Sequence, residues 1–218
     1  MSPRLPLIFA LAVALLAPLP AAQPRNLSQA KDEVYLYINS GKYGRDLTKV
    51  AVKAGKYVAK RAAKPLKEGE KRAIVFDIDE TTLTNLSHIT AHDFGYVPTV
   101  WKNWVASGQA RAIIPVQLVY DVAVRNNVEV FFITARGESE RAATERNLRQ
   151  VGYATWTKIY FKADGSELPS RAFKTGVRRQ ITADGYTIIA NFGDQHSDLD
   201  GGFAERAFKL PNPFYIVK

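Results

Sequence analysis

The chain of 218 residues contains no cysteine. This excludes disulfide bonds, thiolate nucleophiles and thiolate metal sites in any compartment. Long apolar runs are nearly absent as well. The one clear run, residues 5–19, is interrupted by Pro6 and Pro18 and falls short of the ~20 residues that a membrane-spanning helix needs.

That run belongs to a predicted leader. Arg4 precedes it and the small residues Ala21 and Ala22 follow it, which is the charged, apolar, small-residue order of a secretory signal. We therefore expect residues 1–22 to be a signal peptide and residues 23–218 to form one periplasmic or secreted domain. Because the chain has no cysteine for lipidation, we expect no membrane anchor after cleavage. Pro20 leaves the cleavage position open.

Acidic residues are fewer than basic ones, and the net charge is +9. The basic excess gathers between Lys49 and Arg72, at spacings of three and four residues that are typical of an exposed helix face. The same charge would also suit an anionic polymer or steer phosphate esters toward a site. We expect no dedicated nucleic-acid binding. The basic residues of this segment include Lys53, Lys56, Lys60, Arg61, Lys64, Lys67, Lys71 and Arg72.

Helical and strand patterns alternate along the chain. Two helices are expected between Ser28 and Ala63, with a break around Gly41 to Gly44, followed by a buried strand at residues 73–76. Further helices are expected at 115–125, 138–150 and 170–183, and further strands at 128–133, 158–161 and 186–190. This order predicts an α/β fold of Rossmann-like type, a three-layer arrangement with a parallel sheet between helices, whose site lies at the carboxyl ends of the strands.

Residues 85–114 interrupt the alternation. The segment is rich in aromatic residues, and a short helix is expected at residues 99–107. Its length predicts a small helical cap over the site rather than a second domain.

The first strand ends in Asp77-Ile78-Asp79-Glu80-Thr81. Two carboxylates one residue apart at a strand end can share two tasks. One attacks phosphorus, and the other donates a proton to the leaving oxygen and later takes one from water. An acidic surface turn or helix cap is the alternative.

Thr134 directly follows the strand predicted at residues 128–133, and Lys174 lies in the helix predicted at residues 170–183. The Thr134 hydroxyl and the amide beyond it could hold a phosphate oxygen, although a threonine that caps the helix near Glu138 is the commoner case. Lys174 could neutralise phosphate and the nearby acids. Lys162 and Arg178 are the rival candidates for that role.

The last predicted strand leads into Gly193-Asp194-Gln195-His196-Ser197-Asp198. Carboxylates are the hard oxygen ligands that magnesium prefers, and Mg²⁺ commonly takes only a few of them from protein. Asp194 fits this role. Asp198 could bind the cation through water or hold Lys174 in place.

Taken in order, these motifs resemble the haloacid dehalogenase superfamily, and within it the acid phosphatase branch that includes bacterial class C acid phosphatases and plant vegetative storage proteins (subfamily IIIB). The likeness extends to Ala143–Leu148 and to Phe208–Tyr215, so it covers nearly the whole mature chain. It implies a Mg²⁺-dependent acid phosphatase. Asp77 would be the nucleophile, Asp79 the general acid and base, and Thr134 and Lys174 the phosphate-binding residues. The metal ligands would be Asp77, the backbone carbonyl of Asp79, and Asp194.

Two positions depart from the family pattern: His196 stands where Trp is frequent, and Ala135 where Gly or Asn is common. Three readings of the function follow. The first is hydrolysis of small phosphate monoesters. The second is a 5′-nucleotidase, in which Phe94, Tyr96 or Trp101 of the cap would stack on a base. The third is a storage or anion-binding protein with little activity, which the intact Asp77 disfavours. The oligomeric state stays open.

Overall fold

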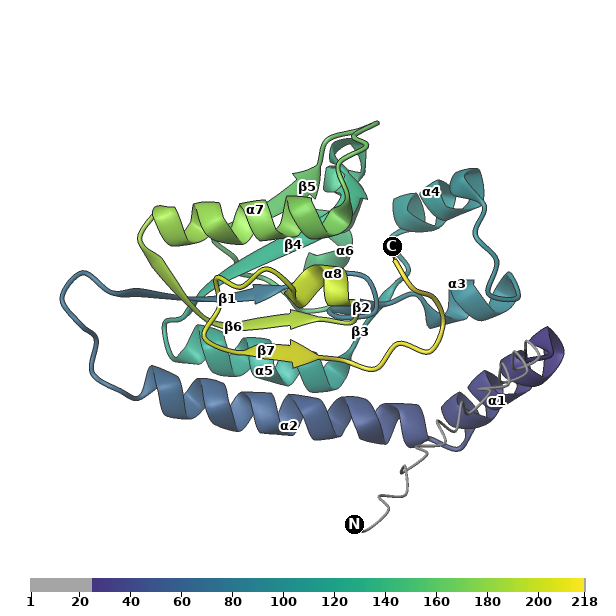
Figure 1. Ribbon diagram of the computed structural model, residues 1–218, viewed down its shortest axis with the longest axis horizontal. Coiled ribbons are helices and arrows are strands. Elements are labelled where there is room, and N and C mark those ends of the chain that lie inside the picture. Colours follow the sequence, from purple (N-terminus) through teal and green to yellow (C-terminus); the bar gives the residue numbers. More distant parts are fainter. Residues whose placement is uncertain (1–24, 218) are drawn as a thin grey trace, which may run out of the picture.

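The computed structural model describes residues 25–217, so the expected leader at residues 1–22 lies outside the described residues. Five parallel strands form the central sheet in the order β5-β4-β1-β6-β7 (Figure 1). Their bounds are β1 (Lys71–Phe76), β4 (Glu129–Gly137), β5 (Lys158–Lys162), β6 (Tyr186–Gly193) and β7 (Ala207–Lys209).

Helices cover both faces of this sheet, with α2 and α5 on one face and α7 on the other (Figure 1). This three-layer arrangement confirms the predicted α/β fold. The bounds are α1 (Leu27–Asn39), α2 (Lys42–Ala62), α5 (Ile114–Arg125), the 3₁₀ turn η1 (Glu138–Glu140), α6 (Arg141–Gln150), α7 (Ser170–Ala183) and α8 (His196–Leu199). No helix within residues 25–217 is long and apolar enough to cross a bilayer.

Strand β1 shows why the sheet is buried on both faces. Its side chains alternate, so that Ile74 and Phe76 pack in the larger core with α2 and α5, while Ala73 and Val75 pack in the smaller core with α7. Phe76 is fully buried between Phe132 and Phe192. Truncating Phe76 to alanine would cost about 3–5 kcal/mol.

The expected cap segment, residues 85–114, contains two helices, α3 (Leu86–Ala91) and α4 (Pro98–Ser107). A short antiparallel pair, β2 (Leu83–Thr84) and β3 (Arg111–Ala112), joins its two ends. Pro98 starts α4 in the position where a missing amide costs nothing, and Gly108 ends it with φ 65°. The segment therefore leaves and returns at one place beside the end of β1.

The strand boundaries differ from expectation where side chains become polar. β4 runs to Gly137 and β6 to Gly193, beyond the predicted ends at Ile133 and Ala190, because both continue to pair with a neighbouring strand. The sequence patterns gave no sign of β7 or α3, since elements of three and six residues are too short for a periodic signal. The expected two helices before the sheet are present, divided at Gly41, which has φ 71°.

Candidate active site

Asp77 directly follows β1, and the ammonium group of Lys174 contacts it. Lys174 Nζ donates to Asp77 Oδ1 and, at 2.6 Å, to Asp198 Oδ1. All three side chains are buried. Burial raises the pKa of Asp77, and the carboxylates of Asp198 and Asp194 add to the rise, against the attraction of Lys174. For Lys174, burial lowers the pKa, but Asp77 and Asp198 outweigh it and the pKa is raised.

Asp194 and Asp198 lie on either side of the turn that follows β6. The backbone amide of Gln195 donates to Asp198 Oδ2 at 2.8 Å, which fixes the turn. Gly193 is required here, because a β-carbon at this position would lie 2.3 Å from Asp198 Cβ. The turn therefore brings both carboxyl groups toward Asp77.

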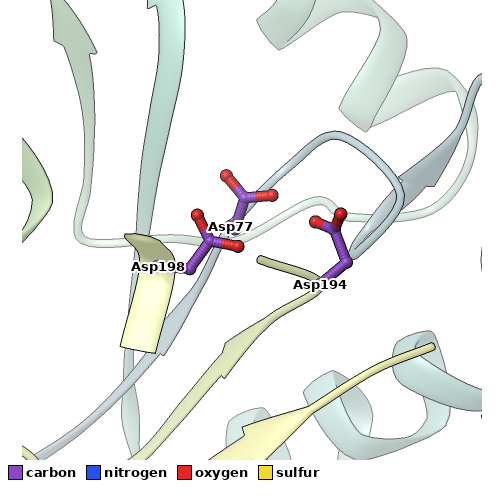
Figure 2. Close-up of side chains that lie close together, drawn as sticks. All are labelled: Asp77, Asp194 and Asp198. Carbon is purple, nitrogen blue, oxygen red and sulfur yellow. The ribbon is translucent and has the colours of Figure 1, made fainter. Parts of the chain in front are cut away.

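The three carboxyl groups of Asp77, Asp194 and Asp198 converge on one volume (Figure 2), and one oxygen of each lies within 4.8 Å of the other two. Lys174 contacts two of them but leaves an excess of negative charge in a desolvated place. Burial and Asp198 also raise the pKa of Asp194. Three hard oxygen donors with uncompensated charge fit a divalent cation.

The carboxylate of Asp79 has a different set of partners. It accepts from the guanidinium of Arg136 at 2.7 Å and from Asn85 Nδ2 at 2.9 Å. Burial opposes ionisation of Asp79, but Arg136 and Asn85 outweigh it, so its pKa is lowered. The two acids of the Asp77-Ile78-Asp79 motif thus occupy different electrostatic surroundings, which suits two different chemical roles.

Glu80 is fully buried beside Asp79 and has φ 54°. Its carboxyl group accepts hydrogen bonds from Asn85 N and Nδ2 and from Tyr215 Oη. Burial and the nearby Asp79 raise the pKa of Glu80 to about 8, although the Asn85 hydrogen bonds favour the carboxylate. Glu80 therefore connects the turn that contains Asp79 to Asn85 and to Tyr215.

Thr134 is fully buried in β4, and its hydroxyl oxygen accepts from the Arg136 amide at 3.1 Å. Ala135 and Arg136, rather than Thr134, line the cavity in front of the strand ends. A phosphate-binding role for Thr134 stays a prediction.

The two rivals of Lys174 lie elsewhere. Arg178 is buried, but its guanidinium donates to the backbone carbonyls of Asp198, Asp200 and Gly202 and so stabilises a loop. Lys162 lines a separate hollow with Gly137 and Asp164. Among the three candidates, Lys174 is the one in contact with Asp77.

A cavity of about 480 Å³ opens over the carboxylates, between the strand ends and the cap segment. Phe94, Tyr96 and Trp101 all line it, Tyr96 with 70% of its surface exposed. The Trp101 ring lies 5.8 Å from the Arg136 guanidinium carbon. The cap aromatics therefore line the same cavity as Asp77 and Asp79.

Four side chains of the site were not identified from the sequence: Asn85, Arg136, Gln195 and Asn212. Asn85 links the cap to the acids, because its Oδ1 accepts from Trp104 Nε1 at 2.8 Å while its Nδ2 donates to Asp79 and Glu80. Polar residues of this kind are common on surfaces, and only their tertiary contacts distinguish these four. Arg136 and Gln195 lie next to predicted site residues in the sequence, Arg136 two residues after Thr134 and Gln195 directly after Asp194, but nothing in the sequence assigned them a role.

The fold and the acidic strand ends define a haloacid dehalogenase-like α/β protein. The chain is similar in structure to the class C acid phosphatase from Bacillus anthracis with tungstate bound, with a TM-score of 0.72 and 24% identity, covering 87% of this chain and 86% of that one. At that level of identity the likeness concerns the fold.

The sequence model described as HAD superfamily, subfamily IIIB (acid phosphatase), matches residues 21–218. The chain belongs to this family. It is 34% identical over 189 residues to Stem 28 kDa glycoprotein of Glycine max (84% of this chain, 72% of that one). It is 31% identical over 196 residues to Acid phosphatase 1 of Solanum lycopersicum (87% and 75%), and 32% identical over 189 residues to Vegetative storage protein 1 of Arabidopsis thaliana (85% and 68%). The predicted family and the predicted enzyme class, a phosphoric monoester hydrolase, are confirmed.

Proposed function

We propose that the protein is an exported, Mg²⁺-dependent acid phosphatase that hydrolyses small phosphate monoesters through an aspartyl phosphate on Asp77. The observation that carries this proposal is the convergence of Asp77, Asp194 and Asp198 around a single volume, with Lys174 in contact with the expected nucleophile. The acid phosphatase family and the relative from Solanum lycopersicum named Acid phosphatase 1 support the same activity.

The first chemical step forms a bond between a carboxylate oxygen of Asp77 and phosphorus, while the ester P–O bond breaks. The leaving alkoxide takes the proton of the Asp79 carboxyl group. In the second step the Asp79 carboxylate accepts a proton from water as the water oxygen attacks phosphorus. The bond between phosphorus and the Asp77 carboxylate oxygen breaks, inorganic phosphate leaves, and the Asp77 carboxylate and the protonated Asp79 are restored.

The side chains around these two acids supply charge and orientation. Lys174 contacts the nucleophile and would offset the negative charge that phosphate brings into a buried place. Arg136 and Asn85 hold the carboxyl group of Asp79, and Thr134 with the amides after β4 would hold a phosphate oxygen.

Asp77 and Asp194, with the Asp79 carbonyl, would hold Mg²⁺, and Asp198 is close enough to hold it directly or through water. When bound, Mg²⁺ supplies positive charge to the phosphate oxygens and lowers the cost of burying several carboxylates together.

The aromatic lining of the cavity favours leaving groups with a flat ring, so we include nucleoside monophosphates among the candidate substrates. A catalytically weak storage protein remains the competing reading, because relatives in the family include a vegetative storage protein. Export to the periplasm or medium rests on the leader sequence alone.

The decisive experiment follows the covalent intermediate. Wild-type protein is quenched in acid during turnover of a radiolabelled phosphate monoester, and we expect bound label that hydroxylamine releases. Asp77→Asn should keep its circular dichroism spectrum and thermal transition but hold no label and lose turnover. A normal rate in Asp77→Asn would refute the proposal. Chelation should abolish wild-type activity and Mg²⁺ should restore it; activity that survives chelation would remove the metal from the mechanism.

A further inference from the structure

The chain after β7, residues 210–217, passes beside the carboxyl end of β6, where Leu210 N donates to Gly193 O. It lines the cavity with Tyr215, Ile216 and Val217. Figure 1 shows this segment in yellow, running from β7 to the C-terminus near α4. We call residues 210–217 the C-terminal strap.

The strap is attached to the rest of the domain at several points. Leu210 N donates to Gly193 O, Phe214 packs at 9% exposure against Tyr43, and Val217 N donates to Gln195 Oε1. The turn within it is set by Asn212, whose Oδ1 accepts from Phe214 N at 2.8 Å. The strap is thus a built part of the site.

One strap side chain acts directly on the carboxylate cluster. Asn212 Nδ2 donates to Asp194 Oδ2 at 2.6 Å, and Gln195 Nε2 donates to the same oxygen at 2.6 Å. Among residues 25–217, the other oxygen, Oδ1, accepts only the longer contact from Thr81 Oγ1 at 3.1 Å. Two amides therefore fix the rotation of the Asp194 carboxylate and occupy one of its oxygens.

We propose that Asn212 is a positioning residue for a divalent cation: it locks Asp194 so that the remaining oxygen faces Asp77 and Asp198, and thereby couples cation binding to the order of the C-terminal strap. The inference rests on the cation of the proposed function. Hydrogen-bond partners of metal-binding carboxylates orient the ligand, and their loss typically lowers metal affinity by about 10–100-fold.

Two variants of Asn212 separate its hydrogen bond to Asp194 from its role in the turn of the strap. Asn212→Ser keeps a short acceptor for the Phe214 amide but cannot reach Asp194, and Asn212→Ala removes both functions. Asn126→Ala is the matched control, because Asn126 is an exposed asparagine whose side-chain amide donates to the Val122 carbonyl in the last turn of α5.

Mg²⁺ affinity is measured by isothermal titration without substrate. We expect both Asn212 variants to bind Mg²⁺ about 10–100-fold more weakly than wild type, and Asn126→Ala to bind as wild type does. Turnover of the Asn212 variants should recover at saturating Mg²⁺, which a general loss of packing would not allow. Wild-type affinity in Asn212→Ser would overturn the inference. Absence of Mg²⁺ binding in wild type would instead overturn the metal in the proposed function.

A second measurement needs no variant. Because coupling between two sites is reciprocal, Mg²⁺ should slow hydrogen exchange of the strap amides of Phe214 and Val217 in the wild-type protein. Exchange in the strap that is the same with and without bound Mg²⁺ would contradict the coupling.

Discussion

The guanidinium of Arg136 donates to both carboxylate oxygens of Asp79, from Nη2 to Oδ1 at 2.7 Å and from Nε to Oδ2 at 3.1 Å. Burial raises the pKa of Asp79, but the charge and hydrogen bonds of Arg136 outweigh it and hold the pKa below its usual range. The general acid of the proposed mechanism must carry a proton, so if Asp79 has that role, this pair restricts its active form to acidic solution. The geometry thus offers a physical reason for an acid pH optimum.

Replacing Arg136 tests this relationship. Arg136→Gln removes the main group that opposes the effect of burial and leaves Asn85 and Lys174. The pKa of Asp79 should therefore rise, and the pH above which kcat/KM falls should move to a higher value. We also expect kcat to drop by about 100-fold because Asp79 loses its orientation. The measurement is kcat/KM across pH, with Arg171→Gln as an exposed control. A fall in kcat/KM that begins at the same pH or at a lower pH would contradict the proposed role of Arg136.

Lys174 is the buried counter-charge of Asp77 and Asp198. Lys174→Met should lower the free energy of unfolding by about 3–5 kcal/mol, because it leaves two buried carboxylates without their cation. Mg²⁺ should restore part of that loss by supplying charge to the same place. Urea denaturation with and without Mg²⁺ measures both effects. Equal destabilisation in the two conditions would mean that the cation does not bind among these carboxylates.

Much of the site could be predicted because parallel strands bring their carboxyl ends to one edge of a sheet. Asp77 and Asp194 are far apart in sequence, yet each directly follows an apolar strand, and the structure places them side by side. The supporting residues could not be predicted in this way. Asn85 and Asn212 act through hydrogen bonds to Asp79 and Asp194 that depend on how the cap and the strap pack.

The basic segment shows the same limit. Helical spacing correctly places Lys53, Lys56 and Lys60 on an exposed face of α2. Arg72, which belonged to the same run of charge, is instead buried in β1 and donates to the Ala62 and Pro65 carbonyls. Helical periodicity cannot show that the chain has left the helix and entered a strand. It also cannot show that Arg72 stabilises the loop between α2 and β1 through hydrogen bonds to backbone carbonyls.

Tyr96 tests whether the cap selects nucleotides. Its side chain lines the cavity and is exposed, and its ring centroid lies 6.3 Å from that of Trp101. If it stacks on a base, Tyr96→Ala should raise KM for a nucleoside monophosphate by at least about fivefold, since stacking contributes about 1–3 kcal/mol. KM for the matching sugar phosphate should stay within about twofold. Equal changes for both substrates would assign Tyr96 to packing of the cap.

Glu70 predicts an acid-sensitive contribution to stability. It is held by Arg61 at 2.6 Å and by Arg72 at 3.1 Å, and hydrogen bonds from Arg72 and Arg61 lower its pKa to about 2. Because its pKa is lower in the folded state, Glu70 stabilises the folded protein fully at pH values above the ordinary pKa of glutamate. This stabilisation is lost as the pH falls toward 2. Glu70→Gln should therefore destabilise the protein at pH 7 by more than at pH 3. A difference from wild type that is independent of pH would show that the charge of Glu70 contributes nothing.

Replacing the exposed lysines of α2 tests whether the basic face of this helix binds an anionic polymer. Lys53, Lys56 and Lys60 each lie two residues after a buried position, Ala51, Ala54 and Val58, and so about 200° around the helix from the core. With Arg206 they line a hollow whose two acids, Glu70 and Glu205, already bond to Arg61. If this face binds an anionic polymer, Lys53→Gln/Lys56→Gln/Lys60→Gln should elute from phosphocellulose at a clearly lower salt concentration than wild type.

A control variant that loses the same number of charges distinguishes binding by the α2 face from the effect of the net charge of the protein. Lys158, Arg171 and Arg179 are exposed on other parts of the surface, and their triple replacement by glutamine removes the same three charges. Local binding predicts a large shift for the α2 variant and a small one for the control, because only adjacent charges engage the same polymer segment. Equal shifts would show that α2 presents a solvated helix face, and phosphatase activity on a small substrate should be unchanged in both variants.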